Sequence, residues 1–313
     1  MRAVAIRDNE VVIEEFPDPQ PGSGEVLVRV RAAGLNGGDM MQRRGLYPAP
    51  SGSHPDIPGM ELAGEVAELG PGAERFAVGD RVMAIVGGGG QAELAVVHER
   101  QLMPVPAALD WPSAGGCPEV FGTAHDALVT QAELRSGERL LVHGGAGGVG
   151  TAAIQLGRSL GARVTATVRR HELRDHVAEL GASVIAPEGF AEHGPFDVIL
   201  ELIGAPNLPE NLQALATRGR IAVIGVSAGA MAELNLLALM GKRARIHGST
   251  LRPRPLEEKA LVARRLEQEV LPLFEERLLH VPVAERFPLA EAAAAYERFA
   301  AGGKLGKIVL IVQ

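Results

Sequence analysis

Residues 143–150 read HGGAGGVG, and five of these eight positions are glycine. An apolar run, 140–142, precedes them, a stretch with helical apolar spacing, 151–160, follows, and a second strand-like run, 162–168, closes the unit. In such a unit the glycines allow a tight turn and let backbone N–H groups and a helix N-terminus face a pyrophosphate. The stretch therefore predicts a Rossmann dinucleotide-binding unit, and a merely structural glycine turn is the alternative.

The glycines fit two spacings of the same motif. Gly145, Gly147 and Gly150 give G-x-G-x-x-G, and Gly144, Gly147 and Gly150 give the broader G-x-x-G-x-x-G. We expect the whole loop to contact the cofactor, namely Gly144, Gly145, Ala146, Gly147, Gly148, Val149 and Gly150.

The end of the second strand indicates which dinucleotide is bound. Arg169 lies 19 positions after Gly150, Arg170 follows it, and no acidic residue lies between Gly150 and Glu172. An acidic side chain here would accept from a ribose 2′-hydroxyl, whereas arginine suits a 2′-phosphate. We therefore expect NADPH, with two solvated surface arginines as the alternative.

Two later strand ends should face the same crevice, because ligands of doubly wound sheets lie beyond the carboxyl ends of the strands. The stretch 201–204, ending at Gly204, and the run Gly225, Val226 and Ser227 are expected beside the nicotinamide. Residues 225–229 also spell G-x-S-x-G, as in a hydrolase nucleophile elbow. No Asp follows Asp197 to complete a triad with a downstream histidine, although glutamates do. We therefore treat Ser227 as a loop residue near the cofactor.

The chain changes character twice. The first hundred or so residues read as short strands cut by Gly, Pro and Asp, which predicts a small barrel or sandwich. Strands and helices alternate from about residue 118, and this predicts a parallel sheet covered by helices. A closing strand, 307–311, needs a partner, and we expect it to return to the first domain. The predicted fold is α/β, with 1–117 and 253–313 forming one domain and 118–252 inserted as the other.

Composition excludes several classes of function. The chain has 31 Lys and Arg against 38 Asp and Glu, a net charge of −7, which disfavours nucleic acid and anionic membranes. The single cysteine, Cys117, forms no internal disulfide and no multi-cysteine zinc site. The nine histidines show no metal-ligand spacing. No apolar run of about 18 residues and no signal segment occur. We expect a metal-free cytoplasmic protein.

Several stretches together resemble the medium-chain dehydrogenase/reductase superfamily, in particular its zinc-free quinone oxidoreductase branch. They are AAGLNGGDMMQRRGLYP, PGMELAGEVAELGPG, GDRVMA, HGGAGGVGTAAIQLGRSLGA, GSTLR and GKIVL, in order along nearly the whole chain. MMQRRGLYPAP, GGGGQAEL and GVGTAAIQL look most similar to stress-inducible relatives of zeta-crystallin. The resemblance implies a GroES-like barrel with an inserted Rossmann domain, NADPH-dependent reduction of quinones, and a homodimer or homotetramer.

Zinc members of this superfamily carry a cysteine in the first loop and a Gly-His-Glu. The chain instead has GLNGGD and Gly59-Met60-Glu61, and the four-cysteine lobe is absent. The resemblance therefore implies that no catalytic zinc is bound. It also adds four residues to the expected cofactor-binding set, namely Thr123, Ser249, Thr250 and Leu251.

A metal-free site must position an electrophilic acceptor and stabilise the oxyanion formed by hydride transfer. Tyr47 and Asn36 lie in the segment that resembles the family's substrate loop, in the cleft expected between the domains. Tyr47 is predicted to hydrogen-bond or protonate the oxygen, or else to pack as a loop aromatic, and Asn36 to anchor the ribose or the acceptor. Asp39 is expected to start a helix as an N-cap. Reduction of a conjugated C=C bond in an enone, enal or enoyl thioester, and a low-turnover NADPH sensor, are the alternative functions.

Overall fold

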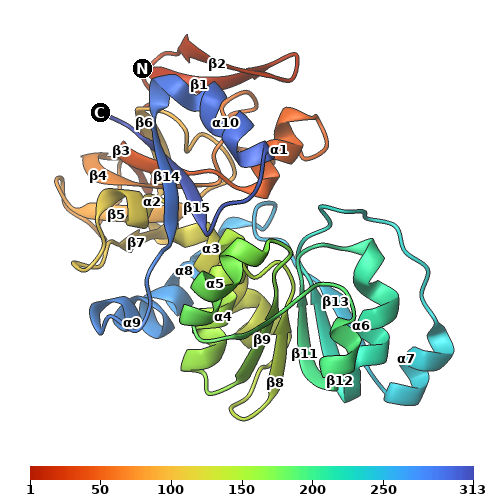
Figure 1. Ribbon diagram of the computed structural model, residues 1–313. Coiled ribbons are helices and arrows are strands. Elements are labelled where there is room, and N and C mark those ends of the chain that lie inside the picture. Colours follow the sequence, from red (N-terminus) through yellow and green to blue (C-terminus); the bar gives the residue numbers. More distant parts are fainter. The chain divides into compact units, whose positions relative to one another are not determined.

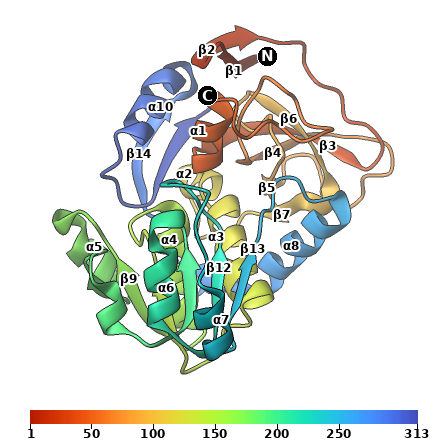
Figure 2. The same ribbon diagram turned by 90° about the vertical axis from the view of Figure 1, so that its right-hand side faces the viewer.

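The protein is described by a computed structural model of residues 1–313 (Figures 1 and 2). The chain forms two compact units. The first comprises 1–122, 251–302 and 307–313, and the second comprises 123–250 with 303–306. The predicted boundaries were 117/118 and 252/253. The short segment 303–306, which was predicted to belong to the first domain, clusters with the second instead.

The first unit is built on a β-sheet of seven strands in the order β14-β15-β3-β4-β5-β7, with β6 paired to β3. A separate hairpin, β1–β2, completes its strands. Val26, Val28 and Val30 of β3 point into a core that also holds Tyr296. The strands are β1 (Arg2–Arg7), β2 (Glu10–Glu15), β3 (Glu25–Gly34), β4 (Glu61–Leu69), β5 (Arg81–Ile85), β6 (Leu94–His98), β7 (Leu102–Pro104), β14 (Val283–Pro288) and β15 (Lys307–Ile311).

The last strand returns to the first unit. β15 pairs antiparallel with β3, where Val309 faces Gly34, and parallel with β14. Because β15 lies beside β3 in one sheet, the second unit is an insertion between two halves of the first (Figure 1). This pairing agrees with the inserted domain that the sequence predicts.

Six α-helices begin in the first unit. They are α1 (Gly37–Arg43), α2 (Trp111–Gly115), α3 (Pro118–His125), α8 (Leu256–Glu269), α9 (Leu271–Glu275) and α10 (Ala292–Ala300). The sequence predicts a charged amphipathic helix over 256–276 that is interrupted at Pro272, and the structure has this interruption at Val270, between α8 and α9. Pro272 lies in the first turn of α9, because proline is tolerated there but not in a helix interior.

The second unit is a parallel sheet of six strands in the order β10-β9-β8-β11-β12-β13. The chain order reverses between β8 and β11, which is where a doubly wound sheet opens its ligand crevice. The fold class is therefore the one predicted. Its strands are β8 (Arg139–Val142), β9 (Arg163–Thr167), β10 (Ser183–Ile185), β11 (Phe196–Glu201), β12 (Leu215–Val223) and β13 (Arg245–Gly248).

The helices of this unit flank the sheet, with α4 lying along β8 and β9 and α6 beside β12 (Figure 2). They are α4 (Gly148–Ser159), α5 (Arg174–Glu179), α6 (Leu208–Ala214) and α7 (Leu236–Lys242). The residue pattern of the sequence predicts a helix over 209–216 and a strand over 220–224. In the structure α6 ends at Ala214 and β12 begins at Leu215. Phe196 of β11 pairs with Leu215 before the register shifts, so tertiary pairing extends the strand. No helix in the structure is long and apolar enough to cross a membrane.

Candidate active site

The glycine loop connects β8 to α4 with two backbone positions that only glycine suits. Gly144 has φ +65°, in the left-handed region. A Cβ on Gly150 would lie 2.3 Å from the carbonyl oxygen of Gly144. Thr151 N–H is the first to bond back within the helix, to Gly147 O, so the N–H groups of the preceding turn are available to an anion.

The loop is held by two other segments of the second unit. Gly145 N–H donates to Thr167 O at the end of β9, and Gly144 N–H donates to Thr167 Oγ1. On the other side Gly306 N–H donates to Ala146 O at 2.8 Å. These hydrogen bonds explain why 303–306 belongs to the second unit, and they hold the backbone of the glycine loop in place.

A buried polar network lies beneath the carboxyl ends of β8 and β11. Asn211 Nδ2 donates to Glu201 Oε2 at 2.6 Å, and His143 Nε2 donates to Asn211 Oδ1 at 2.8 Å. Thr167 Oγ1 lies 3.2 Å from His143 Nδ1. Burial lowers the pKa of His143 and outweighs the opposing charge of Glu201, so the imidazole is neutral. The assignment of its ring protons follows from these partners.

Glu201 shapes the turn that follows β11. Its Oε1 accepts from the N–H groups of Ile203 at 2.6 Å and Gly204 at 2.8 Å. The side chain is 2% exposed. Sequence reasoning placed the stretch 201–204 at the nicotinamide half; the structure assigns Glu201 to holding the turn, whose backbone it fixes by two charge-assisted bonds.

The arginines predicted to meet a 2′-phosphate both follow β9 and are exposed. Arg170 Nη1 lies 3.3 Å from Glu172, and its guanidinium covers Gly303. Arg169 makes no side-chain hydrogen bond or ion pair within the protein. Arg174, which turns inward, donates to Val168 O. Arg169 is therefore the arginine at this strand end with its donors available.

The other predicted cofactor residues fall into two groups. Gly225, Val226 and Ser227 follow β12 in the second unit, and Ser227 is exposed without a histidine partner, which leaves the hydrolase alternative without a catalytic pair. Ser249, beside Thr250, donates to Asp126 in the same unit, where Thr123 also lies. Leu251 belongs to the first unit, where its side chain is buried next to Gly122.

In the first unit, Asn36 belongs to a buried ionic cluster. Lys307 Nζ lies 2.7 Å from Glu61 Oε1 and donates to Asn36 Oδ1 at 2.6 Å and Leu35 O at 2.7 Å. Asn36 Nδ2 donates to Glu61 Oε1 at 2.9 Å and to Gly34 O at 3.3 Å. The amide's donors and acceptor are thus engaged within the protein, so anchoring of ribose or acceptor by Asn36 would require these bonds to be exchanged.

Asp39 was expected to be an N-cap, and this was wrong by three positions. Helix α1 begins after Asn36, and the Asp39 carboxylate reaches back to the N–H of Asn36 at 2.8 Å and also accepts from Gly59 N–H at 3.1 Å. This is the acidic partner of a capping box, because the N3 side chain satisfies the N-cap donor. Complete burial raises the pKa of Asp39 to about 6.

Tyr47 lies in the loop after α1 and is half-buried. Its hydroxyl makes no hydrogen bond to the protein, whereas the other tyrosine, Tyr296, donates to Gln91 at 2.9 Å. Burial raises the pKa of Tyr47, helped by the charge of Glu119 and opposed by Arg252. Tyr47 is therefore a protonated phenol with a free donor.

Arg252 positions the Tyr47 loop. Its guanidinium stacks over the Tyr47 ring at 4.9 Å and donates to Tyr47 O at 2.9 Å. It also donates to Gly87 O at 2.7 Å and to Gln42 Oε1. One buried side chain thus joins three segments of the first unit. Arg252 ends the GSTLR stretch quoted in the sequence analysis, which gave it no role of its own.

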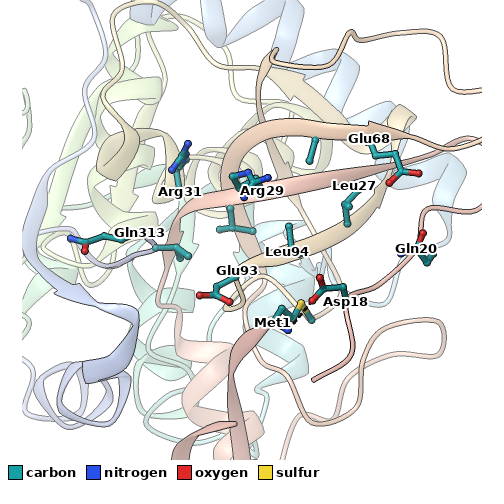
Figure 3. A pocket seen from close by; sticks show the side chains of 13 residues that line it. Met1, Asp18, Gln20, Leu27, Arg29, Arg31, Glu68, Glu93, Leu94 and Gln313 are labelled. Atoms are coloured by element: carbon teal, nitrogen blue, oxygen red, sulfur yellow. Dashed lines mark hydrogen bonds and ion pairs between the residues drawn. The ribbon is translucent and has the colours of Figure 1, made fainter. Parts of the chain in front are cut away.

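The surface also holds a hollow between β3, β4 and the two termini of the chain (Figure 3). Arg29, Glu68 and Gln313 are among the residues that line it, and the Met1 ammonium pairs with Asp18 at 2.8 Å. None of the predicted site residues lines this hollow. Its charges are solvated surface groups, and it is no part of the candidate site.

The fold and these residues agree with the comparisons. Residues 22–107 match the alcohol dehydrogenase GroES-like domain family, and 174–310 match the family described as zinc-binding dehydrogenase. A quinone oxidoreductase of Pseudomonas aeruginosa is 34% identical over 95% of this chain and 94% of its own. The acryloyl-coenzyme A reductase of Metallosphaera sedula is 29% identical over 99% of both. A mycobacterial protein solved with NADPH superposes with TM-score 0.88 at 28% identity, covering 99% of this chain and 100% of that one.

The chain therefore belongs to the medium-chain dehydrogenase/reductase superfamily, and it is an oxidoreductase of that family with a nicotinamide-binding Rossmann domain. More particularly, its relatives include quinone oxidoreductases and an acryloyl-coenzyme A reductase.

The zinc named in the second family does not fit the residues present. At the cluster of Asn36 and Glu61, the carboxylate and the amide oxygen already hold the Lys307 ammonium. A cation beside that ammonium would be repelled, and a carboxamide is a poor zinc ligand. No three His, Cys, Asp or Glu side chains in the structure are grouped to hold a metal ion.

Proposed function

We propose that the protein is an NADPH-dependent quinone reductase that acts without a metal. The observation that carries this proposal is the Lys307 ammonium bound to Glu61 at 2.7 Å, where a metal would have to displace it. Without a Lewis acid the acceptor must be electrophilic by itself, and a quinone is such an acceptor. The 34% identity to a quinone oxidoreductase supports this acceptor class.

The glycine loop and Arg169 would hold the cofactor. NADPH supplies the hydride when bound. The backbone N–H groups at the start of α4 would receive its pyrophosphate, and Arg169, with its donors available, would pair with the 2′-phosphate. The solved relative that contains NADPH supports the phosphorylated dinucleotide.

Tyr47 would serve as the proton donor. Once the acceptor oxygen carries the negative charge, the Tyr47 O–H would donate its proton to that oxygen, and a proton taken up from solvent would restore the phenol. Arg252, whose guanidinium lies 4.9 Å over the ring, stabilises the transient tyrosinate. The raised pKa of Tyr47 keeps the proton in place until the oxyanion forms.

The test is oxidation of NADPH by chelator-treated protein, measured with an ortho-quinone, a para-quinone and an enal, with NADH in parallel. Turnover of quinones that favours NADPH is expected. Turnover of the enal alone would replace the proposal by reduction of a conjugated C=C bond, the activity suggested by the acryloyl-coenzyme A relative. Cofactor binding without turnover on any acceptor would indicate a sensor.

The Tyr47→Phe variant tests the proton donor separately. We expect kcat to fall about 100-fold with little change in NADPH binding, since general acid catalysis contributes on this scale. Full activity of this variant would remove Tyr47 from the mechanism and leave metal-free reduction standing.

We also propose that the protein forms a homodimer through its second unit. Six of the twelve exposed large apolar side chains lie between Val226 and Met240, among them Met231 at 91% and Leu237 at 78% exposure. The adjacent strand β13 is the edge of the sheet. A second copy can pair with this edge and cover the apolar side chains at once. Leu237→Asp should give a monomer in light scattering, whereas Leu261→Asp, on α8, should not.

A further inference from the structure

The buried polar network of the second unit joins two turns at one edge of its sheet. Gly144 of the glycine loop follows β8, and Ile203 lies in the turn after β11, the strand that pairs with β8. A Cβ on Gly144 would lie 3.3 Å from Ile203 Cδ1, so the two turns are in contact. A dinucleotide bound to a doubly wound sheet crosses the point where the strand order reverses, which is here. The position of one turn relative to the other therefore matters for cofactor binding.

The donors and acceptors of the network have one consistent order. The Glu201 carboxylate only accepts, so Asn211 turns its Nδ2 toward Glu201 Oε2, at 2.6 Å. Asn211 Oδ1 then faces His143 Nε2 at 2.8 Å and accepts its proton. His143 is neutral, since burial lowers its pKa, and a neutral imidazole has one N–H. Its Nδ1 is therefore an acceptor.

Thr167 extends this order to the glycine loop. Its Oγ1 lies 3.2 Å from His143 Nδ1, and Gly144 N–H donates to the same Oγ1 at 3.3 Å. Because Nδ1 carries no proton, the hydroxyl donates to it and keeps its lone pairs for Gly144. A hydroxyl that donates one hydrogen bond accepts the next one more strongly. Water does not compete, since all four side chains of the chain are at most 2% exposed, namely His143, Thr167, Glu201 and Asn211.

The other oxygen of Glu201 holds the turn after β11. Oε1 accepts from the N–H groups of Ile203 and Gly204, as described above. The same turn holds the loop after β12, because Ala228 N–H donates to Ile203 O at 2.9 Å and Gly225 N–H donates to Glu201 O at 3.1 Å. One carboxylate thus has one oxygen on this turn and the other on the chain that leads to Gly144.

We infer that Glu201 is a positioning residue for the dinucleotide: it sets the direction of the hydrogen-bond chain, and the chain holds the Gly144 amide in the orientation that binding requires. The four side chains act through the backbone of the two turns. The inference rests on dinucleotide binding by the Rossmann unit and is independent of which acceptor is reduced.

Glu201→Gln should reverse the chain while keeping its shape. The new amide leaves its oxygen with the two backbone N–H groups of the turn, so its nitrogen faces Asn211. Asn211 then turns its oxygen toward this donor and its Nδ2 toward His143, which moves the imidazole proton from Nε2 to Nδ1. Thr167 Oγ1 is left to accept from both His143 and Gly144, and its hydroxyl proton loses its partner.

The tautomer of His143 is the direct measurement. Nitrogen NMR of the cofactor-free protein, labelled at histidine and recorded at pH 8, distinguishes the two tautomers, and His143→Gln assigns the signal among the nine histidines. We expect the proton on Nε2 in the wild type and on Nδ1 in Glu201→Gln. The same tautomer in both proteins would overturn the inference.

NADPH affinity, measured by nicotinamide fluorescence, tests the effect on the loop. Glu201→Gln should weaken binding about fivefold, the scale of one impaired hydrogen bond. The double variant Glu201→Gln/Asn211→Asp restores the original order, because the new carboxylate accepts from the new amide and from His143 Nε2. It should recover the wild-type tautomer and most of the affinity. A double variant with the restored tautomer and the full loss of affinity would separate the chain from binding and reject its role.

Thr167 tests whether the effect travels along the chain. Thr167→Val removes the link to Gly144 and should weaken NADPH binding about fivefold, whereas Thr167→Ser keeps the hydroxyl and should bind normally. Adding Glu201→Gln to Thr167→Val should then cost no further affinity. A further fivefold loss would refute transmission through Thr167. If Glu201→Gln fails to fold, the two Thr167 variants decide alone, and equal binding by both would refute the chain.

Glu138→Gln is the matched control. Glu138 belongs to the same unit, precedes β8 at the opposite end of the sheet, and pairs with Arg220 at 2.7 Å. The variant removes the same charge, and it should change neither the tautomer of His143 nor the affinity for NADPH. An equal loss of affinity in Glu138→Gln and Glu201→Gln would reduce the effect to net charge and reject the inference.

Discussion

Glu201 in the second unit and Glu61 in the first are buried carboxylates with different kinds of partner. In the second unit Glu201 is satisfied by donors close to it in sequence, the N–H groups of Ile203 and Gly204 and the amide of Asn211. In the first unit Glu61 depends on Lys307, which the chain supplies only when its last strand returns. The Glu201 carboxylate is therefore held mainly by residues close to it in sequence, whereas the Glu61 carboxylate depends on a long-range ion pair.

The largest effect is expected from breaking that ion pair. Lys307→Met leaves Glu61 buried and unpaired, which typically costs about 3–5 kcal/mol of unfolding free energy. Urea unfolding of the first unit should show this loss. The double variant Lys307→Met/Glu61→Gln should recover part of it, because it removes the orphaned charge. Equal stability of the single and double variants would mean that Glu61 is relieved by water.

The Gly150→Ala variant, which adds a Cβ to the glycine loop, tests the second unit. In Gly150→Ala the new Cβ would meet Gly144 O at 2.3 Å, so the helix start and the cradle must move apart. We expect NADPH affinity to fall about 10- to 100-fold, the scale of losing one hydrogen bond to a charged group. Gly241→Ala on α7, where a Cβ meets nothing within 4 Å, is the control and should bind NADPH normally.

The preference for NADPH over NADH should depend on Arg169 more than on Arg170. Arg169→Gln should raise KM for NADPH about tenfold and leave KM for NADH unchanged, because only the 2′-phosphate pairs with the guanidinium. Arg170→Gln should have a smaller effect, since Arg170 already contacts Glu172 and Gly303. Arg163→Gln, at the opposite end of β9, is the control. An equal rise in KM for NADPH and for NADH would show that Arg169 does not pair with the 2′-phosphate.

The smallest expected effect is on how the stability of the folded state depends on pH. His143 is buried with a lowered pKa, so the unfolded chain takes up its proton more readily, and this group makes stability fall as pH drops through 6.5 and below. Asp39, with a pKa raised to about 6, acts in the opposite direction, favouring the folded state as pH falls toward 4. On going from pH 7.5 to pH 5.0 the urea midpoint should therefore fall less, or rise more, in His143→Gln than in the wild type. An unchanged difference would show that His143 is protonated in the fold.

Sequence reasoning worked best where one segment carries its own partners. The glycine loop and the alternation of strands and helices were predicted, since periodicity and glycine spacing are local properties. The return of 307–311 was predicted from a different argument, that a closing strand needs a partner. The boundary between α6 and β12 was misplaced, because the pairing of Phe196 with Leu215 extends the strand. Helix propensity alone cannot report such pairing.

The sequence by itself determined the fold class, the dinucleotide loop and the superfamily, because each can be recognised from short contiguous stretches of residues. Only the tertiary structure decided what surrounds Tyr47 and Asn36. Asn36 and Lys307 are 271 residues apart and bond at 2.6 Å, and Arg252 reaches Gln42 across 210 residues. Contacts of this kind depend on how the sheet and helices pack, and no local pattern of residues encodes them.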